Sequence, residues 1–470
     1  EKIKYPLWNE ENDMPDDPRP YGIAGWYKND SLLFVYDKYD IWKISFNPYD
    51  NLTNTTKGRD KKISYRYLRA DQDEKFIDLW ISKWLRGVDE NNKSELLGRW
   101  NMQPNGSFGL INYLMGNVRV SSLMSDKRGD VFIVIKESFA MSPNIFSSYN
   151  VFNTTIGDVD ASHDYSFPRQ LSDINPQQKD YNWGTAELYK WKAFNGKMSE
   201  GVLYKPEDFN PKKKYPMLMY FYETHSDELN TYIQPAPTPS RLNIPFFVSR
   251  GYVVFCPDIR YTNGHPAKSC YDYVVSAAQD LAKQKWIDAK NIGIQGQSWG
   301  GIQVAQLITM TDMFKAAWAG APVANMTSAY GGIRWESGVN RQFQYEKSQS
   351  RIGATLWEKP ELYIENSPLF HLPKVKTPLV IMSNDADGAV PWYQGIELFT
   401  AMRRLGKQVW MLNYNGEAHN LVERKNRKDI QIREQQYFDW LLKGAKPPKW
   451  ITEGVPAVKK GKEWGLELVD

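Results

Sequence analysis

The segment Gly296-Gln297-Ser298-Trp299-Gly300 has the residue types and spacing that best fit a chemical role in this chain. The pattern G-x-S-x-G is typical of a sharp turn between a strand and a helix, in which a serine hydroxyl is exposed as a nucleophile. The residues around it agree, because 291–295 predict a buried strand and 301–310 predict a helix. The small residues of the motif leave room for a serine in a strained conformation. We therefore predict that Ser298 is a nucleophile.

A serine nucleophile needs a histidine base, and the order of residues along the chain selects one. In chains with this turn, the order is serine, then acid, then histidine. The chain has five histidines, of which only His371 and His419 follow Ser298. His371 precedes the strand expected to carry the acid, whereas His419 lies in a loop just after the predicted strand at 409–414. His419 is therefore the predicted base.

The base in turn needs a carboxylate to orient it. This acid is expected in the loop after the predicted strand at 379–382, which contains both Asp385 and Asp387. Asp387 is favoured because it lies nearer the turn at Gly388, where the next element begins. Asp385 is expected to make hydrogen bonds within the loop.

Acyl transfer also needs hydrogen-bond donors aimed at the developing oxyanion. One is expected to be the backbone N–H of Trp299, which directly follows the nucleophile. The second should come from the loop after the predicted strand at 216–222, where Tyr222 offers a hydroxyl. The pattern alone leaves open the alternative that Tyr222 is ordinary packing at a strand end.

These residues require a scaffold, and the chain divides into two contrasting parts. A chain of 470 residues is too long for one core. Residues 183–450 alternate strands and helices, which predicts an α/β class domain with a doubly wound, mostly parallel sheet. Residues 451–470 are expected to form a C-terminal surface tail.

Residues 1–182 instead contain short β runs separated by polar turns, which is typical of propeller blades or a sandwich. The predicted strands are 31–36, 41–46, 76–84, 118–124 and 131–136. A closed propeller of about seven or eight blades, at about 40–50 residues a blade, needs about 300 residues or more. Only two to four blades fit, so we expect an incomplete propeller portion.

Composition excludes several classes of function. The net charge is only +4 and no extended basic block occurs, which argues against nucleic-acid binding. No apolar stretch approaches the roughly 18 residues that span a membrane. No Cys/His cluster has metal spacing, so neither metal nor cofactor is predicted. Cys256 and Cys270 are expected to be unpaired thiols, with one disulfide as the alternative.

The chain begins at Glu1 without a signal-like segment, so we expect a processed or truncated protein. Triplets such as Asn51-Leu52-Thr53 fit an exported protein. An envelope, periplasmic or secreted location is therefore favoured over the cytoplasm, although the compartment is not fixed by these signals.

Three motifs together resemble the prolyl oligopeptidase family of serine peptidases. They are 296–301 around Ser298, Asp387-Gly388-Ala389-Val390-Pro391, and Gly416-Glu417-Ala418-His419. The resemblance covers about residues 185–450. It implies an α/β-hydrolase domain paired with an N-terminal β-propeller that restricts access to peptides. It also implies that Ser298, Asp387 and His419 are nucleophile, acid and base, and that the Tyr222 hydroxyl completes the oxyanion hole.

The sequence also departs from that family's pattern. Ala389 stands where many members carry an Arg or Asn that holds a substrate carbonyl. The aromatic pocket that grips proline is expected shortly after Pro322-Val323, where this chain has Met326, Tyr330 and, further on, Trp335. We predict these three as substrate-pocket residues and do not expect a preference for proline.

The sequence thus predicts a serine peptidase that cleaves oligopeptides through an acyl-enzyme on Ser298, of oligopeptidase, dipeptidyl-peptidase or acylaminoacyl-peptidase type. One alternative is an esterase or acylase with the same triad, and another is an inactive propeller-based binding protein. The expected partners are peptide substrates, and either a missing propeller segment or another chain that covers open sheet edges.

Overall fold

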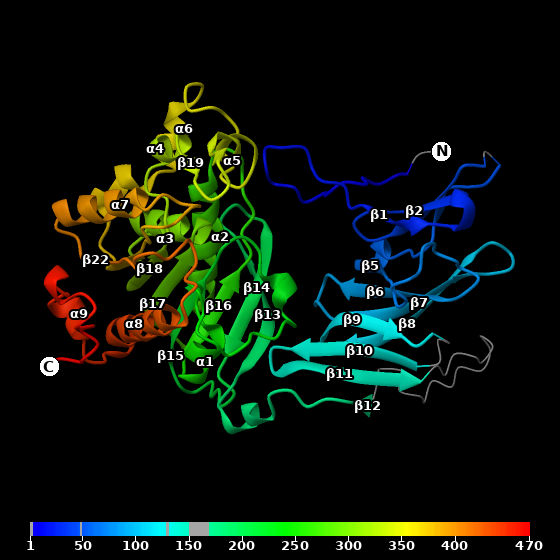
Figure 1. Ribbon diagram of the computed structural model, residues 1–470, viewed down its shortest axis with the longest axis horizontal. Coiled ribbons are helices and arrows are strands. Elements are labelled where there is room, and N and C mark those ends of the chain that lie inside the picture. The colour runs from blue at the N-terminus through cyan, green and yellow to red at the C-terminus, as the bar shows by residue number, and fades with distance from the viewer. Residues whose placement is uncertain (1–2, 48, 128–130, 150–168) are drawn as a thin grey trace. The chain divides into compact units, whose positions relative to one another are not determined.

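The computed structural model describes residues 3–47, 49–127, 131–149 and 169–470 (Figure 1). The chain separates into two compact units. The first comprises Glu1–Asn12, Asp17–Asp180 and Asp227–Gln234, and the second comprises Asp13–Asp16, Tyr181–Ser226 and Pro235–Asp470.

Antiparallel sheets make up the first unit. Its described residues form three sheets of four strands, each strand pairing with its neighbour in the chain. The strands are β1 (Ile23–Trp26), β2 (Leu32–Tyr36), β3 (Ile41–Ser45) and β4 (Thr53–Asn54); β5 (Ile63–Leu68), β6 (Lys83–Asp89), β7 (Glu95–Met102) and β8 (Phe108–Gly116); and β9 (Arg119–Ser125), β10 (Val131–Ser138), β11 (Met141–Tyr149) and β12 (Arg169–Gln170). The predicted blade-like architecture is confirmed.

Aromatic side chains join each sheet to the next. Phe34 of β2 packs edge-on against Trp100 of β7, with ring centroids 5.3 Å apart. Trp84 of β6 meets Phe132 of β10 in the same way, also at 5.3 Å. Such pairs add about 0.5–1.5 kcal/mol each beyond the area they bury. The alternating inward residues of the strands therefore build two continuous inter-sheet cores.

One predicted strand in this unit is wrong. Of residues 76–84, only the last two belong to β6, and the rest form a loop. Ile77 and Leu79 are nevertheless buried in the first inter-sheet core. The apolar pattern marks anchoring side chains of a loop, which sequence alone does not distinguish from a strand.

A mixed sheet of eight strands forms the core of the second unit, in the order β13-β14-β16-β15-β17-β18-β21-β22. The two β13–β14 and β14–β16 pairings are antiparallel, and all later neighbours are parallel. The strands are β13 (Thr185–Lys192), β14 (Met198–Lys205), β15 (Tyr215–Tyr220), β16 (Val253–Pro257), β17 (Ile287–Gln297), β18 (Ala316–Gly320), β21 (Leu379–Met382) and β22 (Val409–Leu412). The predicted mostly parallel sheet is confirmed.

Helices cover both faces of this sheet (Figure 1). Trp318 of β18 packs on Tyr437 and Phe438 of α8, on the face that α1 shares. Its neighbours Ala317 and Ala319 point the other way, into the core beneath α2, α3 and α7. The helices are α1 (Ile244–Ser249), α2 (Pro266–Leu281), α3 (Trp299–Met310), α4 (Met326–Tyr330), α5 (Gln342–Lys347), α6 (Pro360–Glu365), α7 (Tyr393–Arg404), α8 (Arg424–Lys443) and α9 (Lys449–Thr452). Two short strands, β19 (Ile333–Arg334) and β20 (Val339–Asn340), pair beyond α4.

The C-terminal segment is mostly exposed and is anchored to α8 at several points. Trp450 and Ile451 of α9 are buried. Arg433 and Gln436 on α8 donate hydrogen bonds to the backbone oxygens of Trp464 and Leu466, at 2.9 and 2.7 Å. These contacts hold the segment against α8. Its Lys- and Pro-rich composition gave no indication of them.

Candidate active site

Ser298 lies at the sharp turn between β17 and α3. Its backbone angles are φ 59° and ψ −113°, a conformation that side-chain-bearing residues rarely adopt. The surrounding backbone is packed too closely for larger residues, since a Cβ on Gly296 would lie 2.4 Å from the Gly300 oxygen, and one on Gly300 2.3 Å from the Phe221 oxygen. The Ser298 N–H donates to the Gly320 oxygen of β18 at 2.7 Å. The turn is thus held by neighbouring main chain on both sides.

Asp387 and His419 lie in the loops that follow two adjacent parallel strands, β21 and β22. The His419 Nδ1 is 2.7 Å from the Asp387 Oδ2. The other carboxylate oxygen accepts from the N–H groups of Ala389 and Val390, each at 2.8 Å. The carboxylate is almost fully buried, with 2% of the side chain exposed, so these bonds fix its direction.

The histidine loop is tied to the serine turn. Gln297, directly before the nucleophile, donates from its side-chain amide to the His419 oxygen at 2.9 Å. Among the described residues no hydrogen bond joins the Ser298 hydroxyl to the His419 ring. Bonds of this kind are often long without substrate and tighten when it binds.

Asp385, the aspartate not chosen as the acid, holds the two loops together. Its carboxylate accepts from the Asn415 side chain at 2.6 Å and the Gly416 N–H at 2.7 Å. The Gly416 N–H is the main reason that the pKa of Asp385 lies below its usual range. The other histidine after Ser298, His371, is bound to the backbone oxygens of Ile364 and Glu365, each 3.2 Å from its Nε2.

The two predicted oxyanion donors belong to residues beside the turn. Trp299 is the first residue of α3, and N–H groups at this position have no intrahelical acceptor. Tyr222 follows β15 beside the turn, since its Cα lies 3.8 Å from the place of a Gly300 Cβ. The Gln349 side-chain amide donates to the Tyr222 hydroxyl at 2.9 Å. The hydroxyl accepts in that bond, so its own proton is left for donation.

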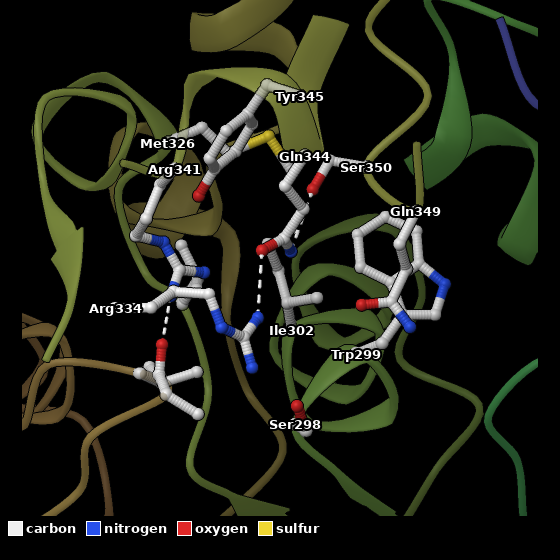
Figure 2. Close-up of a pocket in the computed structure, with 13 residues that line it drawn as sticks. Ser298, Trp299, Ile302, Met326, Arg334, Arg341, Gln344, Tyr345, Gln349 and Ser350 are labelled. Carbon is white, nitrogen blue, oxygen red and sulfur yellow. Dashed lines mark hydrogen bonds between the residues drawn. The ribbon is translucent and has the colours of Figure 1, made fainter. Parts of the chain in front are cut away.

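A small hollow, partly open to solvent, adjoins Ser298 and Trp299 (Figure 2). Of the three predicted pocket residues, only Met326 lines it. Tyr330 instead packs edge-on against Tyr363, and its hydroxyl donates to Glu346. Trp335 is 71% exposed. The short helix α4 directs Tyr330 into the core. Met326 and Tyr330 are therefore close in sequence, but only Met326 lines the hollow.

Sequence reasoning missed most of the hollow. Arg334, Arg341, Gln344 and Tyr345 line it beside Met326, all from one segment between β18 and β21 (Figure 2). Arg341 donates from Nη1 to the Ala389 oxygen, and so holds the loop that carries Asp387. The sequence signal for this lining was Arg334, a charged residue next to Trp335 in a stretch expected to form an aromatic pocket.

Cys256 and Cys270 are both buried free thiols, as favoured from the sequence. No cluster of His, Cys, Asp and Glu suited to a metal ion occurs in the described part of the chain. Likewise, within the described ranges, no helix is both long and apolar enough to cross a membrane.

Part of the second unit matches a known protein family. Residues 239–445 match the model of the prolyl oligopeptidase family. This part of the chain belongs to that family. The matched region contains Ser298, Asp387 and His419, together with the pocket segment between β18 and β21.

Curated relatives of this prolyl oligopeptidase family segment are longer proteins. The chain is 24% identical over 303 residues to the uncharacterized peptidase YuxL of Bacillus subtilis, covering 60% of this chain and 43% of that protein. It is 22% identical over 461 residues to dipeptidyl-peptidase 5 of Porphyromonas gingivalis, covering 85% of this chain and 63% of that protein. The chain therefore spans about half the length of these relatives.

Solved structures resemble both units. A puromycin hydrolase aligns with a TM-score of 0.62 at 16% identity, covering 95% of this chain and 63% of that one. The acylaminoacyl peptidase of Pyrococcus horikoshii aligns with a TM-score of 0.62 at 17% identity, covering 94% of this chain and 66% of that one. The α/β-hydrolase fold preceded by propeller-like blades is therefore confirmed.

Proposed function

We propose that this protein is a serine peptidase that hydrolyses oligopeptides through an acyl-enzyme on Ser298. The observation that carries the proposal is the 2.7 Å pair of His419 with the buried Asp387, in a loop tied by Gln297 to the strained serine turn. This constellation suits acyl transfer. The name of the matching family and the named activities of the relatives favour an oligopeptidase, dipeptidyl-peptidase or acylaminoacyl-peptidase type.

In the proposed reaction, His419 Nε2 takes the hydroxyl proton of Ser298 as Oγ attacks the scissile carbonyl carbon. Asp387 accepts the hydrogen bond from Nδ1 and stabilises the imidazolium that forms. The Trp299 N–H and the Tyr222 hydroxyl donate to the oxyanion, and donors of this kind lower the barrier by about 3–4 kcal/mol each. His419 then gives its proton to the leaving amine. Water then attacks the acyl carbon while His419 takes its proton. The ester bond to Ser298 Oγ breaks, His419 returns the proton to Oγ, and the acid product leaves.

We assign this chemistry to residues 183–450 and propose that residues 1–182 are a propeller portion that limits access to peptides. The three sheets leave strand edges, which a further propeller segment or another chain would cover. The expectation of an exported or envelope protein stays a prediction, as does the role of 451–470 as a tail.

The proposal is tested by labelling with a fluorophosphonate probe. We expect the probe to modify Ser298, as mapped by mass spectrometry, and Ser298→Ala to lose both labelling and peptide hydrolysis. Ser31→Ala, an exposed serine of the first unit, is the matched control and should label normally. A folded preparation that fails to label at Ser298 would contradict the proposal. Activity on p-nitrophenyl esters without activity on peptides would favour an esterase.

A further inference from the structure

The hollow beside Ser298 carries positive charge without negative charge. Its only ionisable basic residues are Arg334 and Arg341, and no Asp or Glu is among the residues that line it. Figure 2 shows both guanidinium groups on the same side of the hollow, with that of Arg334 directed toward the region above Ser298. The remaining lining is polar amide and hydroxyl groups with apolar side chains.

Neither guanidinium is neutralised by the protein. Arg334 donates from Nη1 to the Gln344 side-chain oxygen at 3.3 Å. Arg341 donates from Nη1 to the Ala389 oxygen and also bonds the neutral Tyr345 hydroxyl. Among the described residues, no ion pair includes either one. Arg341 is 1% exposed, and its Nε is buried without a hydrogen-bond partner. These two groups have unused donors and unbalanced charge inside a partly enclosed site.

Arg351, a few residues further along, is a buried arginine of the same segment whose charge is balanced within the protein. Its guanidinium pairs with Asp13 at 2.7 Å and with Glu223 at 3.0 Å. It also lies over the Tyr261 ring, 4.1 Å from the centroid. A buried charge is costly unless an opposite charge accompanies it. The contrast indicates that the counter-charge of Arg334 and Arg341 comes from a ligand.

The other groups of the hollow fit an acidic side chain. Tyr345 is 1% exposed, and burial raises its pKa, so its hydroxyl stays neutral and supplies no anion. Ile302, Val323 and Met326 offer apolar walls for the methylene groups of a side chain. Since Ser298 and Trp299 also line the hollow, its occupant is attached next to the carbonyl under attack.

We propose that this hollow binds the side-chain carboxylate of a glutamate or aspartate directly before the scissile bond. Arg334 is the main specificity-determining residue, and Arg341 adds a second positive charge while holding the Ala389 loop. Planar guanidinium groups match carboxylates in pairs of parallel hydrogen bonds. This inference rests on the proposed peptidase function and names its substrate class.

The test compares peptides that differ only in Glu or Gln before the cleaved bond, which are nearly equal in size but differ in charge. We expect the wild-type kcat/KM to favour Glu by at least about tenfold, since a polar site left unpaired rejects the uncharged analogue. Arg334→Gln should bring the ratio near one by slowing Glu cleavage alone. Arg404→Gln, an exposed arginine of α7, is the control and should keep the wild-type ratio.

Two results would overturn the inference. A wild-type enzyme that cleaves the Glu and Gln peptides equally has no acidic specificity. Equal losses on both peptides in Arg334→Gln would mean that Arg334 supports the fold or a backbone carbonyl. As a positive counterpart, Arg334→Glu should prefer Lys at the same position over Gln.

A binding measurement separates this inference from the proposed function. Ser298→Ala cannot cleave, so the difference in calorimetric affinity between the intact Glu and Gln peptides reports on the hollow. We expect tighter binding of the Glu peptide, and loss of that difference in Ser298→Ala combined with Arg334→Gln. Equal binding of both peptides contradicts the acidic pocket. If Ser298 in the wild type does not label but the Glu peptide still binds more tightly, the peptidase proposal fails and the pocket assignment stands.

Discussion

Two regions of the second unit border the same hollow and are built in opposite ways. The corner consists of the loops after β17, β21 and β22, which carry the proposed triad of Ser298, Asp387 and His419. The pocket wall consists of residues 326–350. In the corner, the Asp387 carboxylate has three hydrogen bonds from the protein itself. In the wall, Arg334 and Arg341 have no carboxylate partner among the described residues.

The comparison shows which part of the site is complete without a ligand. The corner is held by main-chain contacts at strand ends, so its geometry is preorganised for one reaction. The wall is held mainly by side chains from short elements, and its charge is balanced only when a ligand is bound. Substitutions in the corner should therefore affect every substrate alike, and substitutions in the wall should discriminate between substrates.

The largest effect is expected from Asp387→Asn, which keeps the shape of the acid but removes its charge. The neutral amide favours the wrong His419 tautomer, so kcat should fall by about 10⁴-fold for all peptides. The matched control is Asp385→Asn, whose side chain bonds Asn415 and Gly416 rather than a ring. Steady-state kinetics should show a small change for the control. Equal losses in both variants would remove the distinction between the two aspartates.

A smaller effect, on stability, is expected from Arg351→Met compared with Arg334→Met. The first change leaves Asp13 and Glu223 without their buried cation and should lower the free energy of unfolding by about 3 kcal/mol. The second removes a guanidinium that has no carboxylate partner, so it should cost within about 1 kcal/mol. Urea unfolding of the two variants measures the difference. Equal destabilisation by both variants would mean that the charge of Arg334, like that of Arg351, is already balanced within the protein.

The smallest effect is expected from Gly300→Ala in the corner compared with Gly331→Ala in the wall. A Cβ at Gly300 would lie 2.3 Å from the Phe221 oxygen, so main chain must move, at a cost of about 2 kcal/mol. At Gly331 the nearest atom would be 3.9 Å away, and a small gain of about 0.5 kcal/mol is expected from the stiffer unfolded chain. Thermal unfolding tests both. A stable Gly300→Ala variant would show that the corner can relax.

The corner was predictable from sequence because short sequence motifs and the order of residues along the chain identify its residues. A turn motif, the order of three residue types and the ends of apolar strands selected Asp387 and His419, which the structure brings within 2.7 Å. Their catalytic roles stay predictions until tested. The mostly parallel sheet was predictable for the same reason, since buried strands are continuous apolar runs.

The wall was not predictable because contacts between residues far apart in sequence decide which side chains line the hollow. Tyr330 belongs to the core rather than the lining because α4 is short and directs it toward Tyr363. The burial of Arg341 follows from the position of the Ala389 loop, which is 48 residues away in sequence. Whether an arginine has a counter-charge depends on segments as distant as Asp13, and no local pattern records it.

The position of the wall in the topology has a consequence for how this protein can be altered. Its segment leaves the end of β18 and returns at the start of β21, two strands that are paired neighbours in the sheet. The ends of the crossover are thus fixed by the sheet, and doubling the length of a flexible connection costs only about 0.6 kcal/mol in chain entropy. The segment from 321 to 378 can therefore be exchanged as a unit. Grafting a related chain's crossover between the same two strands should change the substrate preference and leave the proposed triad in place.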